Sequence, residues 1–232
     1  MELAARVRSN LYTYLFFILI AAVGILYGNT IAGSEVNLRI WTVGNLLLML
    51  VGVPFLFVQK QAGLPDFLDA GVSGNSRFIF PMLAGIVFGF LDLIVFRIIL
   101  HPEPYDSLPP FLQPFPYSIF LYFSGAFEVE VFYRLIPITI FGLAGRYFMK
   151  GRYKEVFLVA AIILTSVREP LEQIPSGSTW LITYSLVTGY AMNLLQAIMM
   201  KRNGFLSSLS VRLGHYLVWH ILLGIHVQFI EL

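Results

Sequence analysis

The stretch SGAFEVEVFYRLIP, residues 124–137, carries Glu128, Glu130 and Arg134 inside an otherwise apolar run over residues 119–141. A charged side chain at the centre of a membrane helix costs about 3 kcal/mol on insertion scales. Such residues therefore pair with one another, line a wet cavity or take part in chemistry. The rest of the sequence is needed to choose among these roles.

The composition is that of a protein surrounded by lipid. Of the 232 residues, 58% are hydrophobic and 12% are charged, whereas about 25% of the residues of a soluble globular domain are charged. We therefore predict an integral membrane protein whose constant partner is the lipid bilayer. The net charge of +2 gives no support for a nucleic-acid partner, and the lack of cysteine excludes disulfides and thiol chemistry.

Apolar runs of membrane-spanning length recur along the whole chain. A bilayer core about 30 Å thick requires roughly 20 apolar residues per helix. We predict an all-α, polytopic transmembrane helical bundle of about seven spans, or eight if one long span is split, forming a single domain over 1–232. The first span is too long for a signal peptide and is predicted to be retained. The predicted spans are 11–32, 40–58, 78–100, 117–147, 155–168, 178–200 and 205–229.

Basic residues alternate between the loops. With seven spans, ten of them fall on one side of the membrane: Arg6, Arg8, Lys60, Arg77, Arg146, Lys150, Arg152, Lys154, Lys201 and Arg202. The positive-inside rule then predicts a cytoplasmic N-terminus and an external C-terminus, in the cell membrane if the organism is a prokaryote. The loop 101–118 contains six prolines and is predicted to be a stiff outer connection, whereas 64–77 is predicted to be a polar inner loop.

Ionisable residues also lie within the predicted spans. Glu130 and Arg134 are four residues apart, so a regular helix would place them on one face, with Glu128 pointing elsewhere. At 1.5 Å per residue, Glu130 and Arg168 each lie about 20 Å deep and could meet near the middle of the membrane. His215 reaches a similar depth, so these side chains predict a polar cavity inside the bundle.

Two further sets of polar residues lie in the third and seventh spans. Arg212 and His215 are three apart and share a face, whereas His220 points away from His215. We treat Arg212 and His220 as secondary site candidates. Asp92 and Arg97, five apart, are expected to form a structural pair.

These features resemble the CPBP family of intramembrane proteases, which process CAAX proteins and bacteriocins and are also called glutamic endopeptidases. The family pattern is Glu-Glu-x-x-x-Arg on one helix, Phe-x-x-x-His on the next and His-x-x-x-Asn on a late helix. Glu130 and Arg134 fit the second Glu and the Arg, and His215 fits the late His. The segment 189–220, with its basic turn and its helix bearing the His, is similar to the closing region of the family. The resemblance covers about 118–225.

The sequence departs from the family pattern at three positions. The first Glu falls at Val129, the middle His near Arg168 and the Asn at Trp219. The resemblance implies an intramembrane endopeptidase, without a cofactor or a metal of its own, acting on a membrane-embedded or lipidated peptide or protein, such as a prenylated one. The catalytic residues it implies are Glu130 or Glu128 as general base, Arg134 orienting the Glu, and His215 and Arg168 as oxyanion donors.

Several alternatives stay open. The departures equally fit a catalytically inactive relative that holds a peptide or lipid as a scaffold, chaperone or immunity protein. Gly71-Val72-Ser73-Gly74 matches the tetrapeptide of rhomboid serine proteases, with His220 as the base. A zinc site from His215, His220 and a Glu is a further possibility. A retinal protein is excluded because the last span has no lysine, and no repeat typical of transporters is found.

Overall fold

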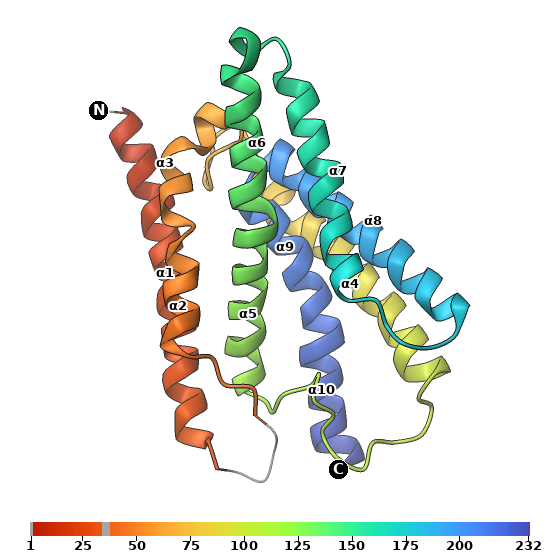
Figure 1. Cartoon of the computed structure of the whole chain (residues 1–232). Helices are drawn as coiled ribbons and strands as arrows, with labels where there is room; N and C mark the ends of the chain where they lie inside the picture. The colour runs from red at the N-terminus through yellow and green to blue at the C-terminus, as the bar shows by residue number, and fades with distance from the viewer. Residues whose placement is uncertain (1, 34–37) are drawn as a thin grey trace.

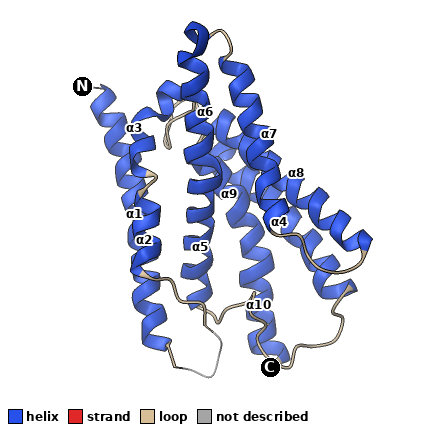
Figure 2. Cartoon of the chain, viewed as in Figure 1, coloured by secondary structure: helices blue, strands red, loops and turns tan. Residues whose placement is uncertain are grey.

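A computed structural model describes residues 2–33 and 38–232, and these residues form helices and loops without any strand (Figure 2). The α-helices are α1 (Glu2–Ile31), α2 (Val43–Leu50), α3 (Val53–Ala62), α4 (Phe80–Asp92), α5 (Tyr117–Glu130), α6 (Ile136–Tyr147), α7 (Lys154–Glu172), α8 (Thr179–Asn203), α9 (Phe205–Tyr216) and α10 (Leu223–His226). Five π-helical segments, Asn75–Ile79, Leu93–Ile99, Val131–Leu135, Leu217–Leu222 and Val227–Glu231, and the 3₁₀ turn Phe148–Gly151 complete the helical elements.

The π-helical segments continue neighbouring α-helices, so the helices form longer columns (Figure 1). Within the described residues, five columns are long and apolar enough to cross a membrane: Val7–Ile31, Val43–Ala62, Asn75–Ile99, Thr179–Asn203 and Phe205–Glu231. The chain is therefore a multi-pass membrane protein. The columns over 117–147 and 154–172 are not among these five; they carry Glu130, Arg134 and Glu169, three buried charged residues.

The predicted spans agree with the helices except at two places. The second span consists of two helices, because α2 ends before Gly52 and α3 begins after it, where a side chain would collide with the Tyr14 hydroxyl. The fifth span was expected to end at Arg168, before Pro170. Instead α7 continues through Pro170 to Glu172, since a proline in the last turn removes only one of its hydrogen bonds.

Glycines bring α4 and α9 into close contact. A Cβ on Gly85 of α4 would overlap the Val211 carbonyl, and one on Gly214 of α9 would overlap the Met82 carbonyl. Small residues at such positions allow the backbones of membrane helices to approach. This packing places the C-terminal end of α4 beside the C-terminal end of α9.

Loops far apart in sequence meet at the two ends of the bundle. At the end where α1 begins, the Asn10 side chain donates to Asp66 at 2.9 Å, and Arg146 donates to the Gln61 carbonyl at 2.9 Å. At the opposite end, the proline-rich loop is tied to the last helix, because the Phe115 amide donates to Gln228 at 2.7 Å. The two long loops therefore lie at opposite ends of the bundle, as the sequence predicts (Figure 1).

Candidate active site

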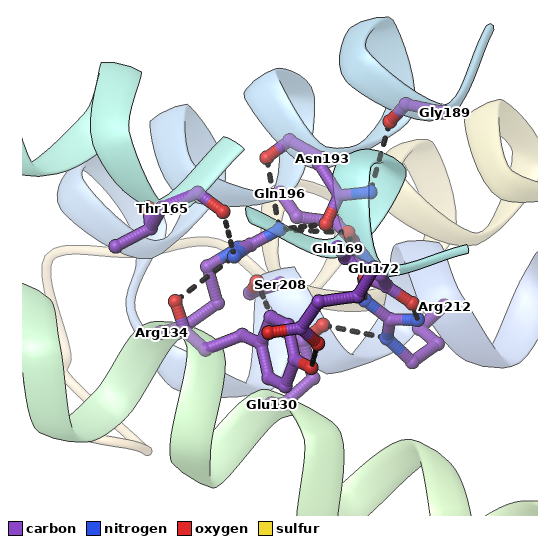
Figure 3. Close-up of polar contacts among 11 residues, drawn as sticks. Glu130, Arg134, Thr165, Glu169, Glu172, Gly189, Asn193, Gln196, Ser208 and Arg212 are labelled. Atoms are coloured by element: carbon purple, nitrogen blue, oxygen red, sulfur yellow. Dashed lines mark hydrogen bonds and ion pairs between the residues drawn. The ribbon is translucent and has the colours of Figure 1, made fainter. Parts of the chain in front are cut away.

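Arg212 of α9 is the centre of a buried ionic network (Figure 3). Its Nε donates to Glu130 of α5 at 2.8 Å, and its two Nη atoms donate to the two oxygens of Glu169 of α7 at 2.7 and 2.6 Å. Ser208 donates to the other oxygen of Glu130. One guanidinium thus holds two carboxylates from two helices. Bidentate pairs of this kind are the strongest class of charged hydrogen bond.

Arg134 is equally buried but binds neutral acceptors. It donates to the Thr165 carbonyl at 3.0 Å, to the Asn193 carbonyl at 3.2 Å and side chain, and to the Gln196 side chain at 3.3 Å. Among the described residues it forms no ion pair with Glu130. The π-helical segment Val131–Leu135 begins directly after Glu130, contains Arg134 and widens the turn, so the expectation of a shared i,i+4 face is wrong. The two side chains tie α5 and its π turn to different neighbouring helices.

Arg168 does not enter the interior. Its side chain is 51% exposed, and its Nε donates to Glu172 one turn away at 2.8 Å. The expected meeting of Arg168 with Glu130 is therefore wrong. Because α7 stays helical beyond Arg168, the next residue points about 100° away, and Glu169 is the one that faces inward. Glu169 was not predicted from the sequence. The available signal was its spacing of four residues from Thr165, which is buried in the structure.

Glu128 is also outside the network. It is half-buried on another face of α5, where its side chain meets Asn45 of α2. The segment that contains it is a regular helix; the π turn begins three residues later. A local distortion that would bring Glu128 to the position of the base is therefore not observed.

A cavity of about 660 Å³ lies beside the network. Its lining includes Glu169 and Arg212, but neither Glu130 nor Arg134. Val129 and Trp219, the two departures on α5 and on the last column, both face this cavity. The charged pair Glu169–Arg212 is therefore the part of the buried network that is adjacent to open space.

The same cavity is lined by a second pair, Asp92 and His215. His215 Nε2 lies 2.7 Å from one oxygen of Asp92, and the Tyr184 hydroxyl donates to the other oxygen at 2.9 Å. A proton on Nε2 satisfies the carboxylate, so this contact assigns the tautomer that leaves Nδ1 as an acceptor. Nδ1 is buried and has no hydrogen-bond partner among the described residues. His215 thus has a fixed ring and an unused basic nitrogen.

The expected Asp92–Arg97 pair is not formed. Arg97 instead donates to Glu231 at 2.7 Å, at the end of the bundle where the chain terminates. The contact between α4 and α9 places Asp92 near a residue 123 positions later. Asp92 is therefore a further carboxylate that faces the interior, although we expected it to form a structural pair with Arg97.

His220 has a separate environment. Its ring stacks on Tyr122 with centroids 4.1 Å apart, and its Nδ1 donates to the Phe111 carbonyl at 2.9 Å. Its ring meets His215 edge-on at 6.4 Å, and no group of three His, Cys, Asp or Glu residues in the described ranges could hold a metal ion. The zinc site that combined the two histidines is thus not formed.

The serine-protease alternative has no geometric basis. The Ser73 hydroxyl bonds to Ser76 at 3.0 Å in the exposed loop at the opposite end from His220. A serine nucleophile and its base must lie within hydrogen-bond reach of each other, so Ser73 and His220 do not form such a pair.

Comparison of the chain with the models of known protein families, with curated proteins and with solved structures finds no match. The residues of the cavity therefore have to be interpreted from their own geometry and chemistry.

Proposed function

We propose that the protein is an intramembrane endopeptidase in which His215 activates water and Asp92 orients His215. The observation that carries the proposal is the 2.7 Å contact between these two residues on the wall of a 660 Å³ cavity within the helical bundle. A carboxylate that fixes the tautomer of an imidazole is the arrangement that general-base catalysis by histidine requires. The resemblance to the CPBP family supports the same reaction class.

In this mechanism His215 Nδ1 takes a proton from water while the oxygen attacks the carbonyl carbon of the peptide. The same proton then passes to the leaving nitrogen as the C–N bond breaks. Arg212 supplies positive charge for the tetrahedral oxyanion. Its five N–H groups make four hydrogen bonds to protein acceptors, which leaves one N–H on Nη1 for this oxygen.

Glu130 and Glu169 have a positioning role in this proposal, instead of the general-base role that the resemblance gives Glu130. Both oxygens of each carboxylate accept hydrogen bonds from Arg212 or Ser208. Each carboxylate oxygen is thus already occupied by a donor from the protein. Together the two carboxylates hold Arg212 at the cavity wall.

The topology and substrate follow from the same proposal. The seven helical columns each cross the membrane, with the N-terminus in the cytoplasm on the side of the basic loops. The substrate is a peptide segment of a membrane-embedded or lipidated protein, because the cavity lies among the helices of the bundle and carries aromatic walls.

A second candidate is a non-catalytic binding protein with the same cavity. The observation in its favour is that both carboxylates of the network are bound by Arg212. In that case the cavity holds a peptide or lipid chain and no bond is broken.

A cleavage assay on the purified protein separates the two candidates. Quenched membrane peptides, including prenylated ones, are incubated with wild type, His215→Ala, Asp92→Asn and Glu130→Gln, and new termini are identified by mass spectrometry. Loss of a general base lowers the rate by about 10²–10⁴-fold, so His215→Ala should be nearly inactive and Asp92→Asn strongly impaired. The matched control is Arg168→Gln, at an exposed site, which should cleave at the wild-type rate.

Cleavage that is unchanged in folded His215→Ala contradicts the assignment of the base. If Glu130→Gln abolishes cleavage and His215→Ala does not, Glu130 is the base, as the family pattern implies. If folded wild type cleaves none of the substrates between pH 5 and 9, the binding protein is the better description.

A further inference from the structure

Arg39 lies at the end of the cavity opposite the basic loops, and its backbone is held on both sides. Its amide donates to the Gln113 side chain at 2.9 Å, and its carbonyl accepts from the Tyr117 hydroxyl at 2.7 Å. Both partners belong to segments far away in the sequence, the proline-rich loop and the start of α5. The position of this residue at the cavity is therefore fixed by the fold.

The side chain of Arg39 is exposed and lines the cavity. Its Nη2 donates to the Tyr122 hydroxyl at 3.3 Å, and the guanidinium lies 5.7 Å from the centre of that ring. Within the described part of the chain, no carboxylate lies at ion-pair distance from it. This distinguishes Arg39 from Arg212, the other arginine of the cavity, which is bound by two carboxylates.

Between Arg39 and the catalytic pair, aromatic side chains form much of the cavity wall. Trp219 stacks on Phe111 at 5.3 Å, and Phe96 packs against the same indole at 5.6 Å; all three line the cavity together with Trp41. An apolar chain fits such a wall, and an unpaired guanidinium at its end fits a carboxylate or a phosphate.

We propose that Arg39 binds the C-terminal carboxylate of a peptide whose apolar side chains occupy the cavity. This inference rests on the proposed function for the use of the cavity, but it concerns binding and is tested without catalysis.

The test uses the intrinsic fluorescence of tryptophan. Two of the three tryptophans, Trp41 and Trp219, line the cavity, and Trp180→Phe removes the third, which is 47% exposed. In this background and in detergent, two ligand pairs are titrated: one acetylated apolar octapeptide with a free or an amidated C-terminus, and dihexanoyl phosphatidic acid against dihexanoylglycerol. The variants are Arg39→Gln and Arg39→Lys, with Arg152→Gln, an exposed cation at the other end of the bundle, as the control.

We expect the peptide with a free C-terminus to bind about tenfold tighter than its amide, the size of one charged hydrogen bond. Arg39→Gln should abolish this preference, Arg39→Lys should keep most of it, and Arg152→Gln should leave it unchanged. Preference for the phosphate without preference for the free carboxylate overturns the proposal and identifies a lipid headgroup as the ligand.

The proposal is also overturned if wild type shows no preference within the peptide pair, or if Arg39→Gln retains the wild-type preference. The same titrations on His215→Ala distinguish this result from a failure of the proposed function. Absence of cleavage with an intact, Arg39-dependent preference would overturn only the catalytic assignment.

Discussion

Two sets of ionisable side chains occupy the bundle interior, and they differ in their access to the cavity. In the network around Arg212, the side chains of Arg212, Glu130 and Glu169 are between 0 and 7% exposed, and their polar atoms bind one another. In the pair of Asp92 and His215, the side chains are 23% and 9% exposed, and one ring nitrogen remains unused. The network around Arg212 therefore joins three helices through fully bonded side chains, whereas the pair of Asp92 and His215 keeps one ring nitrogen without a partner among the described residues.

The largest effect is expected from Arg212→Met. It leaves Glu130 and Glu169 buried without a cation, and removing one partner of a buried ion pair costs about 3–5 kcal/mol. The free energy of unfolding, measured by titrating the purified protein from mild detergent into SDS, should fall by this amount. Neutralising all three side chains, with Glu130→Gln and Glu169→Gln added, should restore much of it, since no buried charge is then unpaired.

The matched control is Arg168→Met, which removes an arginine from an exposed ion pair on α7. Exposed pairs contribute about 0–1 kcal/mol, so this variant should unfold close to wild type. If both arginine variants lower the free energy of unfolding by the same amount, the Arg212 network is no more important for stability than a surface ion pair. The contrast between buried and exposed ion pairs is then wrong.

The helical bundle itself was predictable from the sequence, because runs of about 20 apolar residues have few alternatives in a membrane. The side-chain partners were less accessible. Glu130 was recognised by its cost in an apolar run, but its partner Arg212 lies 82 residues later, and a π turn removes it from Arg134. Neither the long-range partner nor the π turn can be predicted from the local spacing of residues.

Two residues of the interior were misassigned for identifiable reasons. The predicted fifth span ends at residue 168, so Glu169 fell outside it, whereas α7 continues to Glu172 and turns Glu169 inward. Asp92 was paired with the nearest basic residue in sequence, whereas the glycine contact between α4 and α9 presents it to His215. In both cases the partner lies on a helix far away in the sequence, and local spacing does not indicate it.

A smaller effect is expected from Asp92→Asn. The amide keeps the shape of the carboxylate, and the site borders the cavity. We therefore expect the free energy of unfolding, measured by the same SDS titration, to fall by about 1 kcal/mol. In contrast, cleavage should fall strongly if the proposed function is right. A loss of stability as large as that of Arg212→Met would place Asp92 and His215 with the network around Arg212, and the distinction between the two sets would have to be abandoned.

The smallest effect is expected at an ion pair outside the bundle interior, between Lys60 and Asp69. The hydrogen bond from Lys60, with a second from the Gly71 amide, holds the pKa of Asp69 below its ordinary value of 3.8. The pair therefore stabilises the fold above that ordinary value, and the contribution disappears as the pH falls through the still lower folded pKa. At pH 6 the free energy of unfolding of wild type should exceed that of Asp69→Asn by well under 1 kcal/mol. This difference should vanish towards pH 3. A difference that grows on acidification would contradict this sign, and one that rivals Arg212→Met would show that burial does not rank the ion pairs of this protein.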